Sequence, residues 1–223
     1  MLTTDTSLLR LLQLSSASLP VGGYAFSQGM EFAIEAGLLK KEEDVHGWIQ
    51  SQLEHNLSHL DLALLHHALT VVRAEDWPAL NELNDLSLAC RESKELRLTD
   101  TAMGEALARL LTSLEIGIPF QKGDEVSFVC LFAIACAHWQ IDYPLAALGF
   151  SWSWLENQVA AATKLVPLGQ TQAQQLLGAL QSDIPHAIEQ AKKLTIDDIG
   201  AGLPMVAILS ARHEQQYSRL FRS

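Results

Sequence analysis

The chain has 223 residues, of which 48% are hydrophobic and 18% are charged, and its formal net charge is −11. This length supports a large hydrophobic core without disulfides or a structural metal, and the composition excludes general disorder. The acidic balance argues against nucleic acid as a partner, because binding to phosphates needs clustered Lys and Arg.

The first predicted helix covers residues 8–14, where leucines recur with helical spacing behind the capping candidate Thr4. Residues 18–29 follow as a loop, because Pro20 and a pair of glycines interrupt helical structure. This loop contains two large aromatic residues, one of which is Tyr24. We therefore expect it to pack against the protein rather than to move freely.

Apolar periodicity predicts helices along the rest of the chain. They cover residues 27–36, 40–57 and 60–72, two or three segments between 76 and 112 with a break near Ser93 or Thr99, and then 125–139, 152–166, 171–180, a segment that begins at 183–185, and 205–211. Thr171 and Gln174 have the spacing of a capping box, which would start one of these helices. No stretch alternates polar and apolar residues as a strand does, so the predicted fold class is all-α.

The predicted helix at residues 152–166 is apolar on nearly every side, and such a helix lies inside a protein. We expect the other helices to pack around it in a single compact domain that spans residues 1–223. Glu156 and Lys164 are its only charged residues. A lysine in this setting needs an ion-pair partner or a route to the surface, because an unpaired buried charge is costly. An internal ion pair and an interface contact both remain open for Lys164.

The densest run of charged residues spans 91–97 and places Arg91 and Glu95 four residues apart. Such runs usually form solvated helix faces with weak ion pairs. We expect this run to be a solvated surface.

Cys90, Cys130 and Cys136 are an odd number of cysteines without C-x-x-C spacing, which favours reduced thiols and a cytoplasmic protein over a disulfide framework or a thiolate zinc site. The N-terminal residues lack the basic segment of a signal peptide. The longest apolar run, residues 126–139, is shorter than the roughly 20 residues that a membrane-spanning helix requires. We expect no association with membranes.

Histidines are frequent between residues 55 and 67, and His55 and His59 have the i, i+4 spacing that places two imidazoles on one face of an α-helix. No third metal ligand is fixed by spacing, so these two are weak candidates for a metal site, and scattered histidines without a metal are the alternative. The usual motifs of phosphate-binding, nucleotide-binding, hydrolytic and metalloprotease sites are absent. This pattern favours a binding or scaffold protein without catalytic residues or a stably bound cofactor.

The last part of the sequence, residues 212–223 (the tail), keeps large and charged side chains to its final positions. Its candidate partner-binding residues are Arg212, His213, Glu214, Gln216, Tyr217, Arg219, Leu220, Phe221 and Arg222. Arginine and aromatic residues dominate binding hot spots. We interpret the tail as a docking segment that contributes little to the core, with packing on its own protein as the alternative.

Four motifs are spread over the chain: Leu19-Pro-Val-Gly-Gly-Tyr24 with Ser27-Gln-Gly29, Ser153-Trp-Leu-Glu-Asn157, Lys164-Leu-Val-Pro-Leu-Gly-Gln170, and Arg212-His-Glu followed by Gln216-Tyr-Ser-Arg-Leu-Phe-Arg-Ser223. Together they resemble the urease accessory protein UreF family over the whole chain. The resemblance implies an all-α homodimer that is not an enzyme and that acts as an adaptor in the maturation of urease. A high apolar fraction with few charges agrees with such a dimer, because helical proteins of this kind often cover part of their surface.

The resemblance also implies partners. Members of that family bind the accessory protein UreD, called UreH in some species, and through this complex they meet the GTPase UreG and apo-urease during nickel insertion. Lys164 would belong to the surface that meets the GTPase, the tail would dock UreD, and Tyr24 would shape the dimer or GTPase face. Nickel would be handled by the assembled complex.

Two other functions remain open from the sequence. One is a regulator that activates GTP hydrolysis by UreG through an arginine offered in trans. The other is a nickel-binding carrier that uses His55 and His59.

Overall fold

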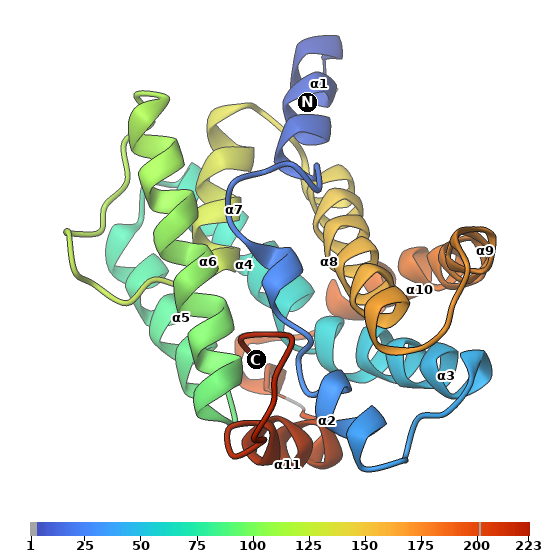
Figure 1. Ribbon diagram of the computed structural model, residues 1–223. Helices are drawn as coiled ribbons and strands as arrows, with labels where there is room; N and C mark the ends of the chain where they lie inside the picture. Colours follow the sequence, from blue (N-terminus) through green and yellow to red (C-terminus); the bar gives the residue numbers. More distant parts are fainter. Residues whose placement is uncertain (1–3, 201) are drawn as a thin grey trace.

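The structure is a computed structural model that describes residues 4–200 and 202–223. Within these ranges all regular structure is helical and no strand occurs, which confirms the all-α prediction (Figure 1). The α-helices are α1 (Asp5–Leu14), α2 (Met30–Glu35), α3 (Glu42–Gln52), α4 (Asp61–Arg73), α5 (Trp77–Ala89), α6 (Lys94–Ser113), α7 (Phe128–His138), α8 (Tyr143–Leu165), α9 (Gln170–Leu180), α10 (Ile184–Ala191) and α11 (Pro204–His213). Four short turns join them: η1 (Gly23–Ala25), η2 (Leu53–Leu57), η3 (Gln181–Asp183) and η4 (Ile196–Asp198).

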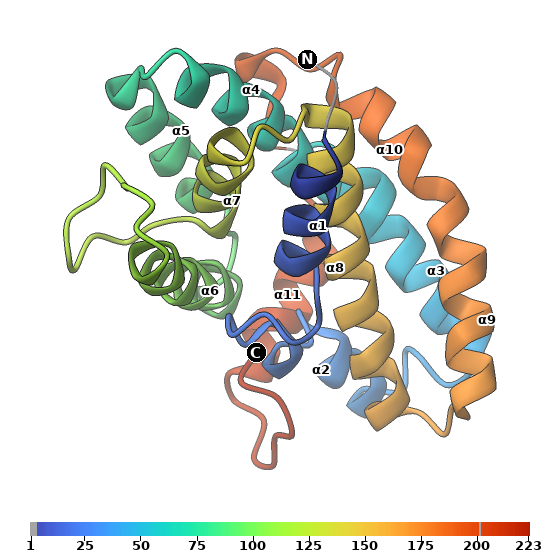
Figure 2. The same ribbon diagram turned by 90° about the horizontal axis from the view of Figure 1, so that it is seen from above.

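Helix α8 lies in the middle of the molecule and contacts α1, α4, α9 and α10 (Figures 1 and 2). It begins at Tyr143, about two turns earlier than the sequence predicts, because Asp142 caps its first turn by accepting a hydrogen bond from the Leu145 amide at 3.3 Å. The central position of the helix is confirmed, but its burial is only partial, since Trp152 and Lys164 are exposed.

The helix that is buried on all sides is α7. Every residue from Phe128 to Cys136 is buried, and α7 packs against α4 and α6. Its long apolar run has no polar face to turn toward water, so neighbours must cover it completely. Neither α7 nor any other helix in the described ranges is at once long enough and apolar enough to span a bilayer.

Some predicted boundaries differ from the structure. Ser93 caps α6 by accepting a hydrogen bond from the Leu96 amide at 3.1 Å, so the break between α5 and α6 falls at Ser93. The capping box predicted at Thr171 is wrong, because α9 already begins at Gln170, and the Gly169 amide donates to Gln172 Oε1 at 2.9 Å. The helix expected through residue 57 does reach Leu57, but its last part, Leu53–Leu57, is the π-helical turn η2 and not α-helix.

Candidate partner-binding surface

The loop between α1 and α2 is packed, as the sequence predicts, and it lies against α8. Gly22 adopts a φ of +75°, which favours glycine, and a Cβ added at Gly23 would lie 2.7 Å from Asn157 Nδ2 of α8. Phe26 is buried, whereas the Tyr24 side chain remains 61% exposed. The loop is therefore fixed by its glycines and Phe26, and it presents Tyr24 to solvent.

Lys164 lies next to this loop, in the last turn of α8, and is exposed. Its Nζ atom lies 6.0 Å from the centroid of the Tyr24 ring and 5.4 Å from that of Phe221, at distances typical of cation–π contacts. No ion pair between described residues includes Lys164, so the internal ion pair left open by the sequence is not formed. Tyr24 and Lys164 thus share one exposed surface, and Lys164 also contacts the buried Phe221.

The tail is a loop that is held at both ends. It leaves α11 after His213, projects outward in Figure 2, and returns to the protein at its last residues. There the Arg222 amide donates to the Ala25 carbonyl at 2.9 Å, and the Ser27 amide donates to the Ser223 carbonyl. The end of the tail is thereby bonded to the loop that presents Tyr24.

The returning tail buries part of its own length. Phe221 and Ser223 are buried, so the expectation that the last residues add little to the core is wrong at these two positions. Tyr217 is fully exposed and Leu220 is 63% exposed, so the turn of the tail remains available. Composition indicated an anchored segment, but it did not indicate which residues face inward.

Glu31 of α2 binds the last residues of the tail where they fold back onto the protein. Its Oε1 accepts a hydrogen bond from the Leu220 amide at 2.7 Å, and its Oε2 accepts one from the Phe221 amide at 2.9 Å. Arg219 pairs with Glu95 of α6 at 3.0 Å. Sequence reasoning missed Glu31, although an acidic residue between the apolar residues Met30 and Phe32 of α2 was a signal that could have been read.

His213 is completely buried between the same two carboxylates. Its Nδ1 lies 2.8 Å from Glu95 Oε2, and its Nε2 lies 3.0 Å from Glu31 Oε2. Burial raises the pKa of the Glu95 carboxyl, and the contacts with His213 and Arg219 oppose this effect. His213 is therefore an internal group rather than a direct partner contact.

The remaining predicted residues of the tail lie at its surface. The side chains of Arg212 and Glu214 are exposed at the end of α11 and take part in no ion pair within the described ranges. Gln216 donates to the Ser218 carbonyl at 2.9 Å, which closes the turn. The Arg222 guanidinium lies 5.8 Å from the Phe26 ring centroid.

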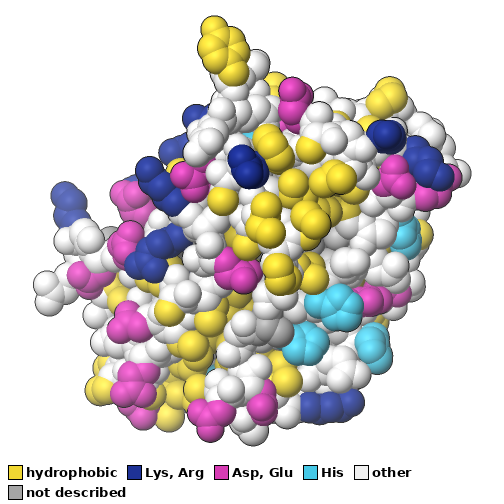
Figure 3. Space-filling view, turned by 90° about the horizontal axis from the view of Figure 1, so that it is seen from below, with side chains coloured by type: hydrophobic (Ala, Val, Ile, Leu, Met, Phe, Trp, Pro, Cys, Tyr) yellow, Lys and Arg dark blue, Asp and Glu magenta, His cyan; other side chains and the backbone are white. Residues whose placement is uncertain are grey.

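Apolar side chains also gather on the face that carries α2 and α11 (Figure 3). Helix α11 contributes Met205 and Ile208, both more than half exposed, and Leu38 follows α2 with similar exposure. This face continues from α11 into the tail.

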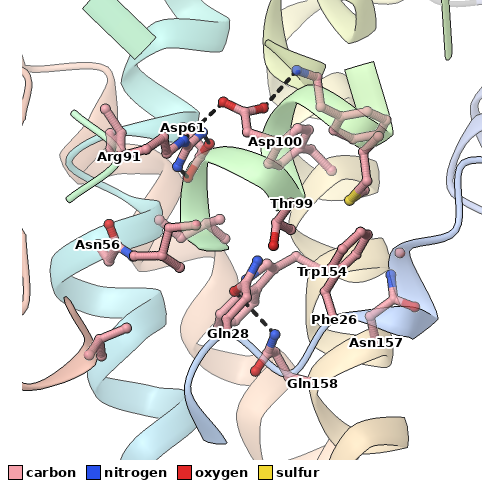
Figure 4. Close-up of a pocket in the computed structure, with 18 of the residues that line it drawn as sticks. Phe26, Gln28, Asn56, Asp61, Arg91, Thr99, Asp100, Trp154, Asn157 and Gln158 are labelled. Carbon is pink, nitrogen blue, oxygen red and sulfur yellow. Dashed lines mark hydrogen bonds and ion pairs between the residues drawn. The ribbon is translucent and has the colours of Figure 1, made fainter. Parts of the chain in front are cut away.

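A pocket with both polar and apolar lining residues lies behind this surface, between the loop, α6 and α8 (Figure 4). Gln28 fastens the loop to its wall, because its Oε1 accepts hydrogen bonds from Trp154 Nε1 at 3.0 Å and Gln158 Nε2 at 3.2 Å. Thr99 lines the pocket and hydrogen bonds with Ser223 at 2.6 Å. Residues that line the pocket therefore contact both the loop and the end of the tail.

Arg91 lies at one side of the pocket, where it is held between two buried carboxylates (Figure 4). Its Nη2 lies 2.6 Å from Asp61 Oδ1, and its Nε lies 2.9 Å from Asp100 Oδ2. Burial disfavours the charge, but Asp100 and Asp61 outweigh this and hold the pKa of Arg91 above its ordinary value. Glu95 is buried as well. The prediction of a solvated charge run is therefore wrong for Arg91 and Glu95, whereas Glu92 and Lys94 are exposed as expected.

The two candidate metal ligands do not lie on a common α-helix. His55 belongs to the π-helical turn η2, and His59 lies in the turn after it, where its Nδ1 is 2.7 Å from Ser58 Oγ. Within the described residues no group of three or more His, Cys, Asp and Glu side chains is placed to hold a metal ion. The helical spacing that suggested this pair is thus not realised.

Comparison with known proteins extends over the whole chain. A family model described as UreF matches residues 39–181. A protein named urease accessory protein UreF from Marinomonas sp. (strain MWYL1) is 62% identical over 221 residues, which cover 99% of this chain and 96% of that protein. Proteins of the same name from Teredinibacter turnerae and Hahella chejuensis are 48% and 44% identical and cover 98% and 97% of this chain, with 100% and 98% of their own lengths.

Proposed function

The chain belongs to the urease accessory protein UreF family, and from this premise we propose that it is a non-catalytic, cytoplasmic adaptor in the maturation of urease. In this proposal the chain forms a homodimer, binds UreD (UreH) and, through that complex, engages the GTPase UreG and apo-urease. Nickel is passed on by the assembled complex, and this chain holds no cofactor of its own.

The observation that carries the proposal is the exposed surface formed by Tyr24 and Lys164, where Lys164 also contacts the buried ring of Phe221. These residues come from the loop, α8 and the tail, three segments that are far apart in the sequence. Exposed aromatic and cationic side chains on a rigid support are typical of binding hot spots. An adaptor needs such a surface and has no need for convergent catalytic groups.

Reconstituted activation of urease tests the proposal. Apo-urease, UreD, UreG, nickel and GTP are combined with and without this chain, and urease activity is measured together with GTP hydrolysis. We expect urease to be activated only when the chain is present. We also expect that no single exposed arginine of the chain increases GTP hydrolysis by UreG. Full activation without the chain would contradict the adaptor function. A large rise in GTP turnover that Arg212→Ala or Arg222→Ala abolishes would establish the activating regulator instead.

Lys164→Ala is expected to weaken the capture of UreG by the complex while leaving the melting temperature nearly unchanged. Lys164 is exposed and has no ion-pair partner in the described residues, so its removal takes away a charged contact without opening the core. Pull-down of UreG and thermal melting measure the two effects. Lys122→Ala, which removes a lysine from the exposed loop between α6 and α7, is the matched control. A large drop in melting temperature without any change in capture would show that Lys164 serves the fold alone.

The double variant Leu9→Asp, Leu12→Asp is expected to turn the dimer into a monomer. These leucines of α1 are 66% and 60% exposed, and Arg10 is the only charged residue between them. Two copies that each carry a net charge of −11 repel one another, so they meet most favourably over an uncharged face. Light scattering after size-exclusion chromatography measures the mass. The control variant Ile196→Asp, at another exposed apolar position, should leave the dimer intact. If the Leu9→Asp, Leu12→Asp variant remains a dimer, α1 is not the interface.

A further inference from the structure

His213 joins four parts of the molecule at one buried point. It is the last residue of α11, and its two ring nitrogens contact Glu95 of α6 and Glu31 of α2. The same two carboxylates bind the tail, Glu31 through the amides of residues 220 and 221, and Glu95 through Arg219. The side chains of Glu31 and Glu95 are only 7% and 5% exposed. Water therefore has little access to replace a lost contact.

The geometry requires one proton more than ordinary ionisation states supply. Each contact between a ring nitrogen and a carboxylate oxygen needs a hydrogen, and a neutral imidazole carries only one. With both carboxylates ionised and the imidazole neutral, one nitrogen lone pair would face a buried carboxylate oxygen. A second proton, on the ring or shared with a carboxyl, removes this repulsion.

The charges around the histidine lead to the same result. Those that face it are Glu31, Glu95 and Arg219, with Glu214 adjacent along its own segment. The two buried carboxylates and the arginine sum to −1, and a protonated imidazole brings this group to zero. Neutralising a buried group avoids the cost of an unpaired charge. The position of His213 at the carboxyl end of α11 also favours a cation, because the helix dipole is negative there.

We propose that His213 is the positioning residue of the tail: a proton held between His213, Glu31 and Glu95 fixes the return of residues 219–223, and removal of this proton at alkaline pH releases them. That the tail docks a partner rests on the proposed function, whereas the proton and the release do not. The tail is attached when the group is protonated, so attachment is complete at lower pH and is lost as the pH rises. A partner that needs the folded-back tail and one that needs the free tail would then respond to pH in opposite directions.

Hydrogen exchange of the Leu220 and Phe221 amides tests the release directly, because both amides donate to Glu31. After correction for the intrinsic pH dependence of exchange, we expect the open fraction to rise by up to about tenfold per pH unit over the range in which the attached state keeps the proton and the released state has lost it, as linkage to one proton requires. In His213→Gln this dependence should disappear, because an amide does not titrate. His186→Gln, at an exposed histidine, should keep the wild-type profile. Protection that does not change between about pH 6 and pH 9 in the wild type would overturn the proposal, and so would an unchanged profile in His213→Gln.

A second measurement covers the case in which His213→Gln does not fold. Nitrogen NMR of the histidine-labelled wild-type protein near pH 7 should show His213 with hydrogen on both ring nitrogens, or one hydrogen shared with a carboxylate. A neutral ring with one free lone pair at this pH would overturn the proposal. Neither measurement contains a partner protein, so failure of the tail to bind UreD would contradict the proposed function and leave this inference standing, and the reverse also holds.

Discussion

Arg91→Ala is expected to lower the free energy of unfolding by about 3–5 kcal/mol, because it leaves Asp61 and Asp100 as unpaired buried carboxylates. Both partners lie within 3 Å of the guanidinium, and the side chains of all three residues are at most 12% exposed. Asp100 also accepts a hydrogen bond from the Phe128 amide at 2.7 Å and so holds the start of α7. The substitution should therefore also destabilise the packing of α7, the most buried helix, in the core. Urea denaturation followed by circular dichroism measures it.

Two variants control this experiment. Arg109→Ala removes an arginine from an exposed ion pair with Glu105, and such pairs contribute little, so it should be close to the wild type. Arg91→Lys keeps the charge but loses the two-sided geometry, so it should fall between the wild type and Arg91→Ala. A loss below about 1 kcal/mol in Arg91→Ala would mean that water hydrates both carboxylates and that the pairing adds little stability.

The double variant Tyr217→Ala, Leu220→Ala is expected to weaken binding of UreD by roughly a thousandfold without lowering the melting temperature. Both side chains are exposed at the turn of the tail, so the folded protein gains little from them. Two anchors that each lose about 2 kcal/mol on truncation account for this factor. Surface plasmon resonance measures the affinity, and differential scanning calorimetry measures the melting temperature.

The contrast with Phe221→Ala makes this prediction specific. Phe221 is buried, so its truncation should lower the melting temperature as well as the affinity. Deletion of residues 216–223 is a poorer test, because it also removes the amides that satisfy Glu31 and the arginine that pairs with Glu95. If the double variant binds UreD with wild-type affinity, the turn of the tail is not the docking element.

The sequence predicts the features that depend on neighbouring residues. The periodicity around α8 and the packed loop before α2 were readable because apolar spacing and glycine pairs act over a few positions. Arg91 was misread for the opposite reason. Its partners Asp61 and Asp100 lie 30 and 9 residues away, and only the packing of α4 against its neighbours brings them within reach. Spacing within a charge run contains no information about such partners.

The candidate site was predictable to a similar extent. Composition drew attention to Tyr24, Lys164 and the tail, and the structure brings the first two together with Phe221. Composition did not indicate that Glu31 binds the tail, because Glu31 and Leu220 are 189 residues apart in the sequence. The pairing of His55 and His59 was misjudged because the interruption of α3 by a π-helical turn has no simple local signature.

The hydrogen bonds between residues 25–27 and residues 222–223 have a further consequence for the order of assembly. Because the loop and the tail are bonded to each other, a ligand that immobilises one also restricts the other, and the second ligand then loses less conformational entropy on binding. If partners bind at the turn of the tail and at the Lys164 surface, as proposed, we therefore expect the two binding events to be cooperative. Thermodynamic reciprocity requires that each partner raise the affinity for the other by the same factor, so neither partner has to bind first. A high concentration of one partner would then raise the fraction of this chain that has the scarcer partner bound.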